Sequence, residues 1–517
     1  MAYIQPNSTI MILHNVPLEP DYEHTLYTAG ANAQVSAFSG FVKYTLNANT
    51  YQRVNKNTCR VGIVADNLYD CNYMMFQNTN FGSKWFYAFI TSVEYINNEC
   101  TEITYEIDVM QSYFHNFTFG YCFVEREHSI TDNIGDNLMP EPVECGDYYM
   151  ESYSSIPELR ELGIFVIDST DVARGIILDE TFQGGRVYCF KMSEETDLVA
   201  FLNQHTQTPE NILAVWTAPC RYVNRTSDKA VSGYSASSLN KEFTALSGTE
   251  TFGSYTPKNK KLYTYPFNFF HVDNGMGQSL QLKYEFFDSF KPRLECSQSI
   301  VQPVEVVARP YGYKGTSVGG GLSAPTPLNA ESIKVSGYGV GSWNNNTWAQ
   351  QLTNNVFNSL VGAGVEGFLA HNSTPVAVQK AKETRLTEGT IHSIIPSFLS
   401  RPFTPQIVYG SGNSGNALAS HNELNFYTGR CRITEQYARS IDDFFTVFGY
   451  QTNRVKEPNI SSRPHWNYVK TGNCEINADE SMPADDAAKV KACMNKGITF
   501  WKSLSEVGRY FLNNAPT

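Results

Sequence analysis

Carboxylates occur in close pairs at several places in the sequence, of which we consider three, and paired carboxylates can perform general acid–base chemistry. The pairs are Glu125 with Glu127, Asp168 with Asp171, and Asp442 with Asp443. Acid–base chemistry needs two carboxylates in different environments, and these usually come from separate segments of the chain. Acids that neighbour each other in one short segment are more typical of a solvated surface. We therefore expect no catalytic role for these pairs.

Other motifs with a known chemistry are missing from the sequence. The ten histidines form neither H-E-x-x-H nor H-x-H, and there is no G-x-S-x-G nucleophile elbow. His128 follows Glu127 and could act as a base, but a hydrogen-bonded structural histidine is the better interpretation. The eleven cysteines are scattered without zinc spacing, which favours reduced and mostly buried thiols. We predict that the protein is not an enzyme, with no catalytic residue, cofactor or metal.

Three further acids, Glu102, Glu106 and Asp108, alternate with apolar residues in TEITYEIDV. The simplest interpretation is the solvent-facing side of a strand. If this strand lines a channel, the same acids would repel phosphate. DNA would then pass without binding, because affinity for DNA comes from neutralising phosphates with Lys and Arg. The net charge of −12 and the lack of a basic stripe agree with a protein that does not grip nucleic acid.

Alternation of apolar and polar residues between Lys84 and Val124 predicts an antiparallel meander. One face of its first strand would carry Trp85, Tyr87, Phe89, Val93 and Tyr95. One face of its second strand would carry Ile103, Tyr105, Ile107 and Val109. One face of its third strand would carry Phe117, Phe119, Tyr121 and Phe123. The 31 Tyr and 32 Phe also favour β structure, so we predict a mainly β fold with some helix.

The middle of the chain contains short strand-like pieces, GIFVID, GRVYCF and ILAVW, between Ser/Thr/Gly-rich connections. Two helices are predicted near the C-terminus. The first carries an apolar stripe of Tyr437, Ile441, Phe444, Phe445 and Phe448 and stops at Gly449. The second runs from Pro483 to Gly497, with acids in its first turn.

A helical apolar stripe interrupted by glycine occupies Leu352 to Leu369, inside about a hundred residues of loop-like sequence. Its apolar members are Leu352, Val356, Phe357, Leu360, Val361, Val365, Phe368 and Leu369. A helix of this length would be about 27 Å long, close to the ~30 Å hydrocarbon core of a bilayer. Gly362, Gly364 and Gly367 would loosen it, each by about 1 kcal/mol. The pattern alone also fits an ordinary amphipathic helix packed on its own domain.

Several long blocks, in the same order, resemble the distal tail-tube or tail-knob protein of small short-tailed bacteriophages with protein-primed DNA replication, the salasvirus type. The N-terminal blocks are YMMFQNTNFGSKWFYAFITSVEY, YEIDVMQSYF and FVEREH. The C-terminal blocks are EQYARSIDDFFTVFGYQTNRVKEPN, HWNYVKTG and NKGITFW. Together they cover about a quarter of the chain.

The resemblance implies a homo-oligomer, a hexameric β-rich tube at the tip of the virion tail, made in the host cytoplasm. The tube domain would combine residues 1–130 and 421–517, with β-rich outer domains at 131–335. A long loop at 336–420 would hold the membrane-active helix. Such loops plug the lumen and penetrate the host membrane during genome ejection, while DNA passes through without specific binding. Other tail proteins would be further partners.

Two other functions remain open at the level of sequence. One is a receptor-binding tail protein, which the tyrosine-rich segments Asp147–Ser155 and Tyr263–Phe270 would suit. The other is a tail-tip hydrolase acting on cell-wall polymer. Tyrosine and tryptophan suit sugar stacking, but the missing catalytic constellation argues against hydrolysis.

Overall fold

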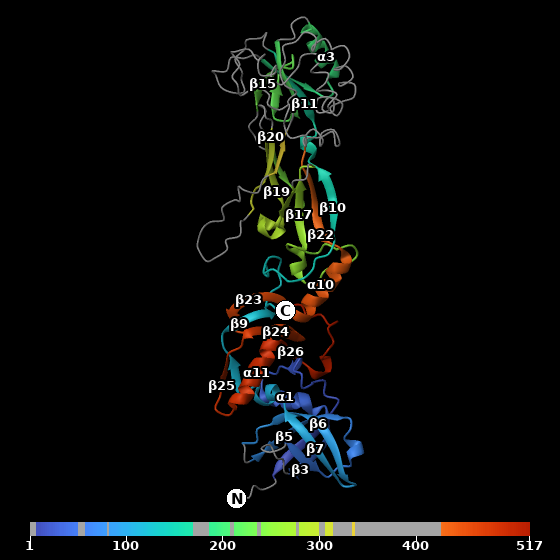
Figure 1. Ribbon diagram of the computed structural model, residues 1–517, viewed down its shortest axis with the longest axis vertical. Coiled ribbons are helices and arrows are strands. Elements are labelled where there is room, and N and C mark those ends of the chain that lie inside the picture. The colour runs from blue at the N-terminus through green and yellow to red at the C-terminus, as the bar shows by residue number, and fades with distance from the viewer. Residues whose placement is uncertain are drawn as a thin grey trace, which may run out of the picture. The chain divides into compact units, whose positions relative to one another are not determined.

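The computed structural model divides into two compact units, each assembled from segments that are distant in the sequence. Unit 1 contains Met1–Gly146, Thr251–Leu262 and Thr434–Thr517, and unit 2 contains Asp147–Glu250 and Tyr263–Ile433. The structure describes residues 7–49, 57–79, 82–168, 186–206, 211–234, 239–275, 279–298, 305–313, 333–336 and 425–516. Mostly antiparallel sheets dominate both units (Figure 1), which confirms the predicted mainly β fold.

The N-terminal sheet of unit 1 has six antiparallel strands. In spatial order these are β3 (Val42–Asn49), β1 (Ser8–His14), β5 (Cys71–Asn78), β6 (Phe86–Asn97), β7 (Cys100–Ile107) and β4 (Thr58–Val61). β5, β6 and β7 are neighbours in sequence and in space, and Asn97 pairs with Cys100 where β6 turns into β7. The predicted meander is thus confirmed for β6 and β7. Ile103, Tyr105 and Ile107 are buried, as their alternation predicts.

Both faces of this sheet bury apolar side chains. On one face Phe76 and Tyr105 belong to a cluster that includes Met494 of the C-terminal segment. On the other face the ring of Tyr73 stacks on Phe38, with ring centroids 5.3 Å apart. Phe38 lies on α1 (Ala31–Ser39), which therefore covers part of this second face.

A β-bulge changes the facing of the side chains along β6. The register with β7 shifts between Ile90 and Ser92, and a bulge of this kind reverses the alternation beyond it. Trp85, Tyr87 and Phe89 stay together on the α1 side, whereas Val93 packs into the opposite cluster. The prediction that these residues and Tyr95 share one face is therefore wrong, because the sequence pattern does not reveal the extra residue.

The second sheet of unit 1 joins the two ends of the chain. Its strands, in order, are β2 (His24–Leu26), β26 (Ile498–Trp501), β24 (Trp466–Asn473), β9 (Cys122–Glu127) and β23 (Tyr450–Lys456). In Figure 1 the cyan β9 lies beside the orange-red β23 and β24, and it pairs with both. These C-terminal strands follow β9 by more than 300 residues, so unit 1 depends on both ends of the chain.

The third strand of the predicted meander is divided between two sheets. β8 (Phe117–Phe119) pairs with β25 (Ile476–Ala478) in a separate two-stranded ribbon, and β9 begins only at Cys122. Phe117 is buried, whereas Phe123 is 40% exposed and Tyr121 is 68% exposed. The prediction of one strand with one aromatic face is wrong here, because the chain leaves the ribbon at Gly120 and enters another sheet.

The two predicted C-terminal helices are present as α10 (Glu435–Phe448) and α11 (Ala484–Lys496). Ile441 and Phe445 of the predicted stripe are buried. Gly449 ends α10 with φ 66° and ψ −151°, and a Cβ there would lie 2.2 Å from the carbonyl oxygen of Glu127. Only glycine fits this conformation and this approach of two backbones. The helix stop is thus also a packing requirement of the second sheet.

The described residues of unit 2 form three further sheets and a strand pair, all antiparallel. The first sheet orders β10 (Tyr148–Ser155), β22 (Tyr427–Ile433), β17 (Asn268–Asp273) and β18 (Ser279–Leu282). The second orders β12 (Arg186–Lys191), β11 (Leu162–Asp168) and β13 (Ile212–Pro219). The third orders β16 (Leu239–Glu242), β19 (Arg293–Gln298), β20 (Glu305–Pro310) and β21 (Ile333–Ser336). The pair is β14 (Val223–Arg225) with β15 (Val231–Tyr234), and a helix, α3, spans Glu195–Gln204.

The strand-like pieces predicted in the middle of the chain are therefore strands of unit 2. GIFVID falls within β11, RVYCF of the second piece falls within β12, and ILAVW falls within β13, and these strands form one sheet. Every residue of β11 is buried. This explains why its sequence is a continuous apolar run rather than an alternation.

Candidate functional site: the acidic face of the N-terminal sheet

The polar side chains of β7 lie in rows across three strands of the N-terminal sheet. Glu102 is the partner of Glu94 on β6 and of Arg60 on β4. Thr104, two residues along on the same face of β7, is the partner of Ser92 and Thr58. Because partners in such a row lie on one face of a sheet, these residues form a continuous polar surface. Glu94 is a member that the sequence analysis did not single out.

The charges on this face are mostly negative. Glu94 and Glu102 oppose each other directly, an arrangement that costs about 0.2–1 kcal/mol for like charges. The Nε atom of Arg60 donates to Oε2 of Glu102 at 2.9 Å, and this hydrogen bond raises the pKa of Arg60. Glu106 is exposed, with Lys489 Nζ 3.5 Å from its carboxylate. Glu102 and Glu106 thus lie on the polar side of the strand, as predicted.

Asp108 does not belong to this surface, which corrects the expectation that it could face a channel. It follows the end of β7, is only 2% exposed, and caps the short helix α2 (Val109–Tyr113). Its Oδ1 accepts from the backbone N–H of Gln111 at 3.0 Å, and its Oδ2 accepts from the Tyr73 hydroxyl at 2.8 Å. The alternation of the strand stops at Ile107, so Asp108 turns into the core.

Burial gives Asp108 an unusual acidity. The loss of solvent raises the pKa of its carboxyl to about 6, although hydrogen bonds from Gln111 and Tyr73 oppose the shift. The side chain of Gln111 continues this network by donating to Thr25 Oγ1 at 2.7 Å and to the carbonyl of Leu26 at 2.9 Å. Asp108 is therefore a structural acid that joins α2 to the N-terminal segment.

One member of each predicted carboxylate pair is buried, which overturns the interpretation of these pairs as solvated surface. Glu127 is 3% exposed and accepts from Lys456 Nζ at 2.5 Å. Asp168 is 4% exposed and lies 3.0 Å from His205 Nε2. Asp442 is fully buried, while its neighbour Asp443 is exposed. Each buried acid is already held by partners that only the folded chain brings close.

His128 is a structural histidine, as predicted. Its Nδ1 accepts from the backbone N–H of Tyr468 at 2.8 Å, and its Nε2 lies 3.1 Å from the carbonyl oxygen of Thr446. Burial lowers the pKa of His128 to about 3, helped by the charge of Arg463. The neutral ring thus fixes β24 and α10 against β9. None of the eleven cysteines, all of which are described, forms a disulfide, and nine of them are buried.

Two buried charge networks in unit 1 were not foreseen. Asp442 accepts from the Tyr255 hydroxyl at 2.5 Å and from the backbone N–H groups of Lys258 at 2.8 Å and Asn259 at 3.0 Å. Glu141, whose side chain is fully buried, pairs with Lys261 at 2.5 Å and also with Arg126. In both networks the bonded partners are more than 100 residues apart in the sequence. The one exception is the pair Arg126 and Glu141. No local pattern could have predicted them.

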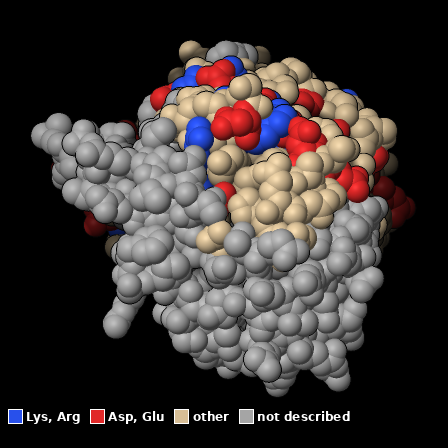
Figure 2. Space-filling view, turned by 90° about the horizontal axis from the view of Figure 1, so that it is seen from above, with Lys and Arg blue, Asp and Glu red and all other residues tan. Residues whose placement is uncertain are grey.

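On the face of unit 2 that Figure 2 shows, the described residues form no basic stripe of the kind that binds DNA. Figure 2 looks onto the end of the molecule that carries α3 and shows acidic and basic side chains side by side. Glu194, for example, pairs with Arg225 at 2.5 Å and with Lys229 at 2.9 Å. Such local neutralisation leaves no basic stripe on this described surface.

The predicted membrane-active residues, Leu352 through Leu369, lie outside the described residues. In the part of the chain that the structure describes, no helix combines the length and apolar character needed to cross a bilayer. The same part contains no cluster of three His, Cys, Asp or Glu side chains that could hold a metal ion.

Known proteins match this chain over nearly its whole length. The family model "Bacillus phage phi29, Tail knob protein gp9, C-terminal domain" matches residues 226–515, and "Caudoviral major tail protein N-terminus" matches residues 6–118. Tail knob protein gp9 of Bacillus phage PZA is 24% identical, covering 99% of this chain and 100% of the relative. The gp9 proteins of Bacillus phages B103 and phi29 are each 23% identical with the same coverage.

A solved structure shares the fold. The tail knob protein gp12 of bacteriophage C1 matches with a TM-score of 0.60 and 14% identity, over 97% of this chain and 98% of that one. The family models, the full-length relatives and this structural match all concern phage tail proteins. The chain therefore belongs to the tail knob protein gp9 family of phi29-like Bacillus phages and is a structural component of the virion tail.

Proposed function

We propose that this chain is the subunit of a distal tail tube or knob, and that copies assemble into a ring through which DNA leaves the virion. The ring would contain six copies, as the family resemblance implies. β3 and β4 are the outer strands of the N-terminal sheet, and each has a partner on one side only within the described chain. Open strand edges can pair with another chain, and a repeated head-to-tail contact closes into a ring.

The observation that carries this proposal is the pair of facing glutamates on the N-terminal sheet. Glu94 and Glu102 are direct cross-strand partners, and Arg60 bonds to only one of them. A monomeric protein gains nothing from this repulsion. On the wall of a DNA channel it would be useful, because acids deny DNA the positive charges that hold phosphates. We therefore assign Glu94, Glu102 and Glu106 to the lumen wall.

We also propose that the apolar segment from Leu352 to Leu369 plugs this tube and enters the host membrane on infection. Its support is the sequence: an apolar stripe with the length of a membrane-spanning helix, loosened by glycine. The segment lies between β21 and β22, which are both strands of unit 2. Unit 1 could thus keep its sheets while this segment changes its position.

Electron microscopy of the purified protein tests the ring, since a uniform monomer at every concentration would contradict it. A gel-shift assay then tests the lumen acids. The wild-type ring should not retain linear DNA, whereas a Glu94→Lys, Glu102→Lys variant should retain it at low salt and release it as salt increases. If the variant forms rings that bind DNA no better than the wild type, these glutamates do not line the DNA path.

Dye release from liposomes tests the membrane role. Deleting residues 346–373 should abolish release and leave the ring intact, and collapse of the ring would instead identify the segment as structural core. Glu366 lies among Val365, Gly367 and Phe368, and a charged acid in an inserting helix costs on the order of 3 kcal/mol. We therefore expect Glu366→Gln to increase release near neutral pH. Equal release by both proteins across pH would exclude Glu366 from the mechanism.

A second function, adsorption to the host cell, is favoured by the first sheet of unit 2. Both tyrosine-rich segments singled out from the sequence contribute to it: Tyr148 and Tyr265 contact Phe269, with ring centroids 5.6 and 5.9 Å away. Tyr148 is 43% exposed and Tyr153 is 50% exposed. Replacing Tyr148 and Tyr153 with serine should weaken binding of the labelled protein to host cells. The matched change at Tyr69 in unit 1, which is 65% exposed, should not.

A further inference from the structure

Two buried cysteines of unit 1 lie opposite each other where the pairing of β9 with β24 ends. Asn473 of β24 is the partner of Phe123 of β9, and the strands are antiparallel. The next position along each chain is a cysteine, Cys474 and Cys122, so the two oppose each other. Opposed residues of antiparallel strands have Cα atoms about 4.5–5.5 Å apart, and a disulfide spans about 4.4–6.8 Å. The backbone thus places these cysteines at a separation that a disulfide can bridge.

The side chains of the two cysteines also point to the same face of the sheet. Cys122 is 3% exposed and Cys474 is 2% exposed, whereas the residues on either side of each cysteine are exposed. Because successive side chains of a strand point to opposite faces, both thiols lie on the inner face. Pairing continues beyond them, since the carbonyl of Glu475 accepts from the N–H of Gly120 at 2.9 Å. The two chains therefore stay side by side before and after the cysteines.

The two thiols are hydrogen-bonded to each other and differ in their surroundings. The Cys474 thiol donates to the sulfur of Cys122, and the backbone N–H of Glu475 donates to the same sulfur. Burial raises the pKa of both thiols, but at Cys122 these donated hydrogen bonds oppose the shift because they stabilise a thiolate. At Cys474 burial raises the pKa to about 12, and the neighbouring Cys122 adds to the rise. Cys122 is therefore the sulfur that ionises first, and Cys474 is placed to react with it afterwards.

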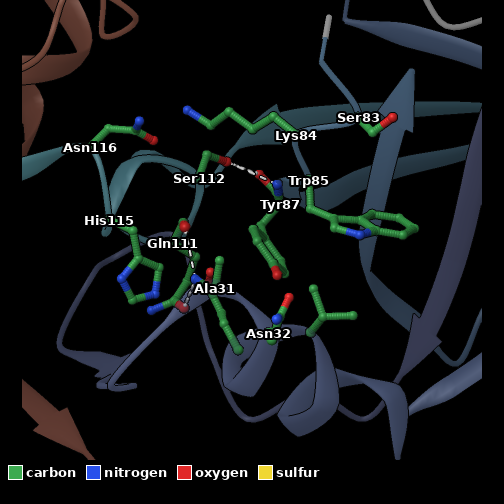
Figure 3. A pocket seen from close by; sticks show the side chains of 12 residues that line it. Ala31, Asn32, Ser83, Lys84, Trp85, Tyr87, Gln111, Ser112, His115 and Asn116 are labelled. Carbon is green, nitrogen blue, oxygen red and sulfur yellow. Dashed lines mark hydrogen bonds between the residues drawn. The ribbon is translucent and has the colours of Figure 1, made fainter. Parts of the chain in front are cut away.

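The cysteine pair stands at one end of the ribbon that β8 forms with β25. Both chains pass there from the ribbon into the second sheet of unit 1. At the other end of the ribbon the Asn116 side chain donates to Asp479 at 2.7 Å, in an exposed position. Figure 3 shows Asn116 after α2, where it lines a cavity of about 560 Å³ together with the start of α1 and the start of β6. A disulfide between the cysteines would fix the ribbon covalently at the end opposite to this hydrogen bond.

We propose that Cys122 and Cys474 form a disulfide when the protein is exposed to a peroxide. The Cys122 thiolate attacks one oxygen of hydrogen peroxide, the O–O bond breaks, and hydroxide leaves and takes up the thiol proton to give water. Cys122 is then a sulfenic acid. The sulfur of Cys474 attacks the Cys122 sulfur, the S–O bond breaks, and hydroxide leaves with the Cys474 proton as a second water. The two sulfurs lose two electrons, and the peroxide gains them.

A virion protein passes through surroundings in which such a bond can form. A tail component folds inside a host cell, where thiols stay reduced, and later leaves the cell. The bond would close a loop of more than 300 residues that contains all of unit 2. In the chain-entropy model, a disulfide that closes a longer loop stabilises the fold more. Oxidation should therefore strengthen the closure of unit 1.

Treatment of the reduced full-length protein with hydrogen peroxide tests the proposal. After unfolding in urea and capping of free thiols with N-ethylmaleimide, peptide mass spectrometry should find Cys122 linked to Cys474. On a non-reducing denaturing gel the oxidised chain should migrate faster, because the bond closes a long loop, and dithiothreitol should reverse this. The midpoint of thermal unfolding should rise by about 5 °C or more. Cys122→Ala and Cys474→Ala should each remove the link, the gel shift and the rise. The matched variant Cys431→Ala, altered at another buried cysteine, should keep all three.

Three results would overturn the proposal or a part of it. If the half-buried Cys100 is oxidised while Cys122 and Cys474 are both recovered capped, the pair is not a site of oxidation. If Cys122 is recovered as a sulfinic acid and Cys474 as a capped thiol, the two sulfurs do not reach each other. A linked protein whose midpoint of unfolding does not rise would keep the disulfide and refute its stabilising role.

Discussion

Replacing Asp108 with asparagine should stabilise unit 1 near neutral pH and remove a pH dependence that the wild-type protein shows. The carboxylate is 2% exposed, and its hydrogen-bond partners, Gln111 and Tyr73, are neutral. Asparagine has the same shape and is itself a favourable helix N-cap. Its Oδ1 can therefore keep the hydrogen bond to Gln111 while the buried charge disappears.

The size of the effect follows from the acidity of the group. The pKa of Asp108 rises from an ordinary 3.8 to about 6 on folding. The folded state thus binds this proton more tightly, so the stability from protonation is fully present below about pH 3.8 and is lost as the pH rises through about 6. By this linkage, the wild-type protein should gain about 2 kcal/mol from this group between pH 7 and about pH 4.5.

Urea unfolding of wild type and variant at several pH values measures this difference. Other groups titrate alike in both proteins, so the difference between their unfolding free energies isolates Asp108. The variant should be more stable at pH 7 by about 1–3 kcal/mol, less the cost of reorienting the Tyr73 hydroxyl. Parallel pH curves would refute a perturbed carboxyl. Glu106→Gln, which removes the same charge from an exposed site, is the matched control and should change the unfolding free energy at pH 7 by no more than about 0.5 kcal/mol.

Three further changes probe the packing of unit 1, two of them measured as a change in unfolding free energy and the third by hydrogen exchange. Asp442→Ala should cost about 3 kcal/mol or more by stranding the N–H groups of Lys258 and Asn259, whereas Asp443→Ala should stay within about 0.5 kcal/mol. Glu141→Ala should cost about 3–5 kcal/mol, because it leaves two cations without their buried partner. Gly449→Ala should prevent the second sheet from closing, seen as lost protection of β9 amides from hydrogen exchange, because its Cβ would clash with Glu127. Equal stability of the Asp442 and Asp443 variants, or normal β9 protection in the Gly449 variant, would contradict these assignments.

Local periodicity was sufficient to predict the elements that bury one side against the protein interior and expose the other. The apolar residues of β7 face one buried cluster, and α10 buries Ala438, Ile441 and Phe445 on one side, so both patterns are clean. The helix ends at Gly449 and Gly497 were also predictable, since a positive φ favours glycine. The long resemblance to tail-knob proteins was visible because its blocks coincide with these well-ordered elements at both ends of the chain.

Features that depend on distant partners could not be predicted in this way. The bulge in β6 is set by its pairing with β7, and Asp108 turns inward because α2 begins there. A sequence pattern treats Asp442 and Asp443 as equivalent, yet only Asp442 meets the returning segment at Asn259. The acidic face of the N-terminal sheet also depends on strand pairing that the sequence pattern does not reveal. Glu102 was visible from its own strand, but its partner Glu94 follows the bulge and appears only once the register is known.

The way unit 1 closes explains how one chain can combine a stable folded unit with long insertions. Its second sheet pairs β9 with β23 and β24, and further bonds such as Asn116 with Asp479 join segments more than 300 residues apart. The entropy of closing a loop grows only with the logarithm of its length, so each doubling costs about 0.6 kcal/mol. If unit 1 is stable when a short connection joins its segments, lengthening that connection lowers its stability only slightly. Long segments between Gly146 and Thr434 are therefore compatible with a stable unit 1, which is built from the two ends of the chain and the returning segment Thr251–Leu262.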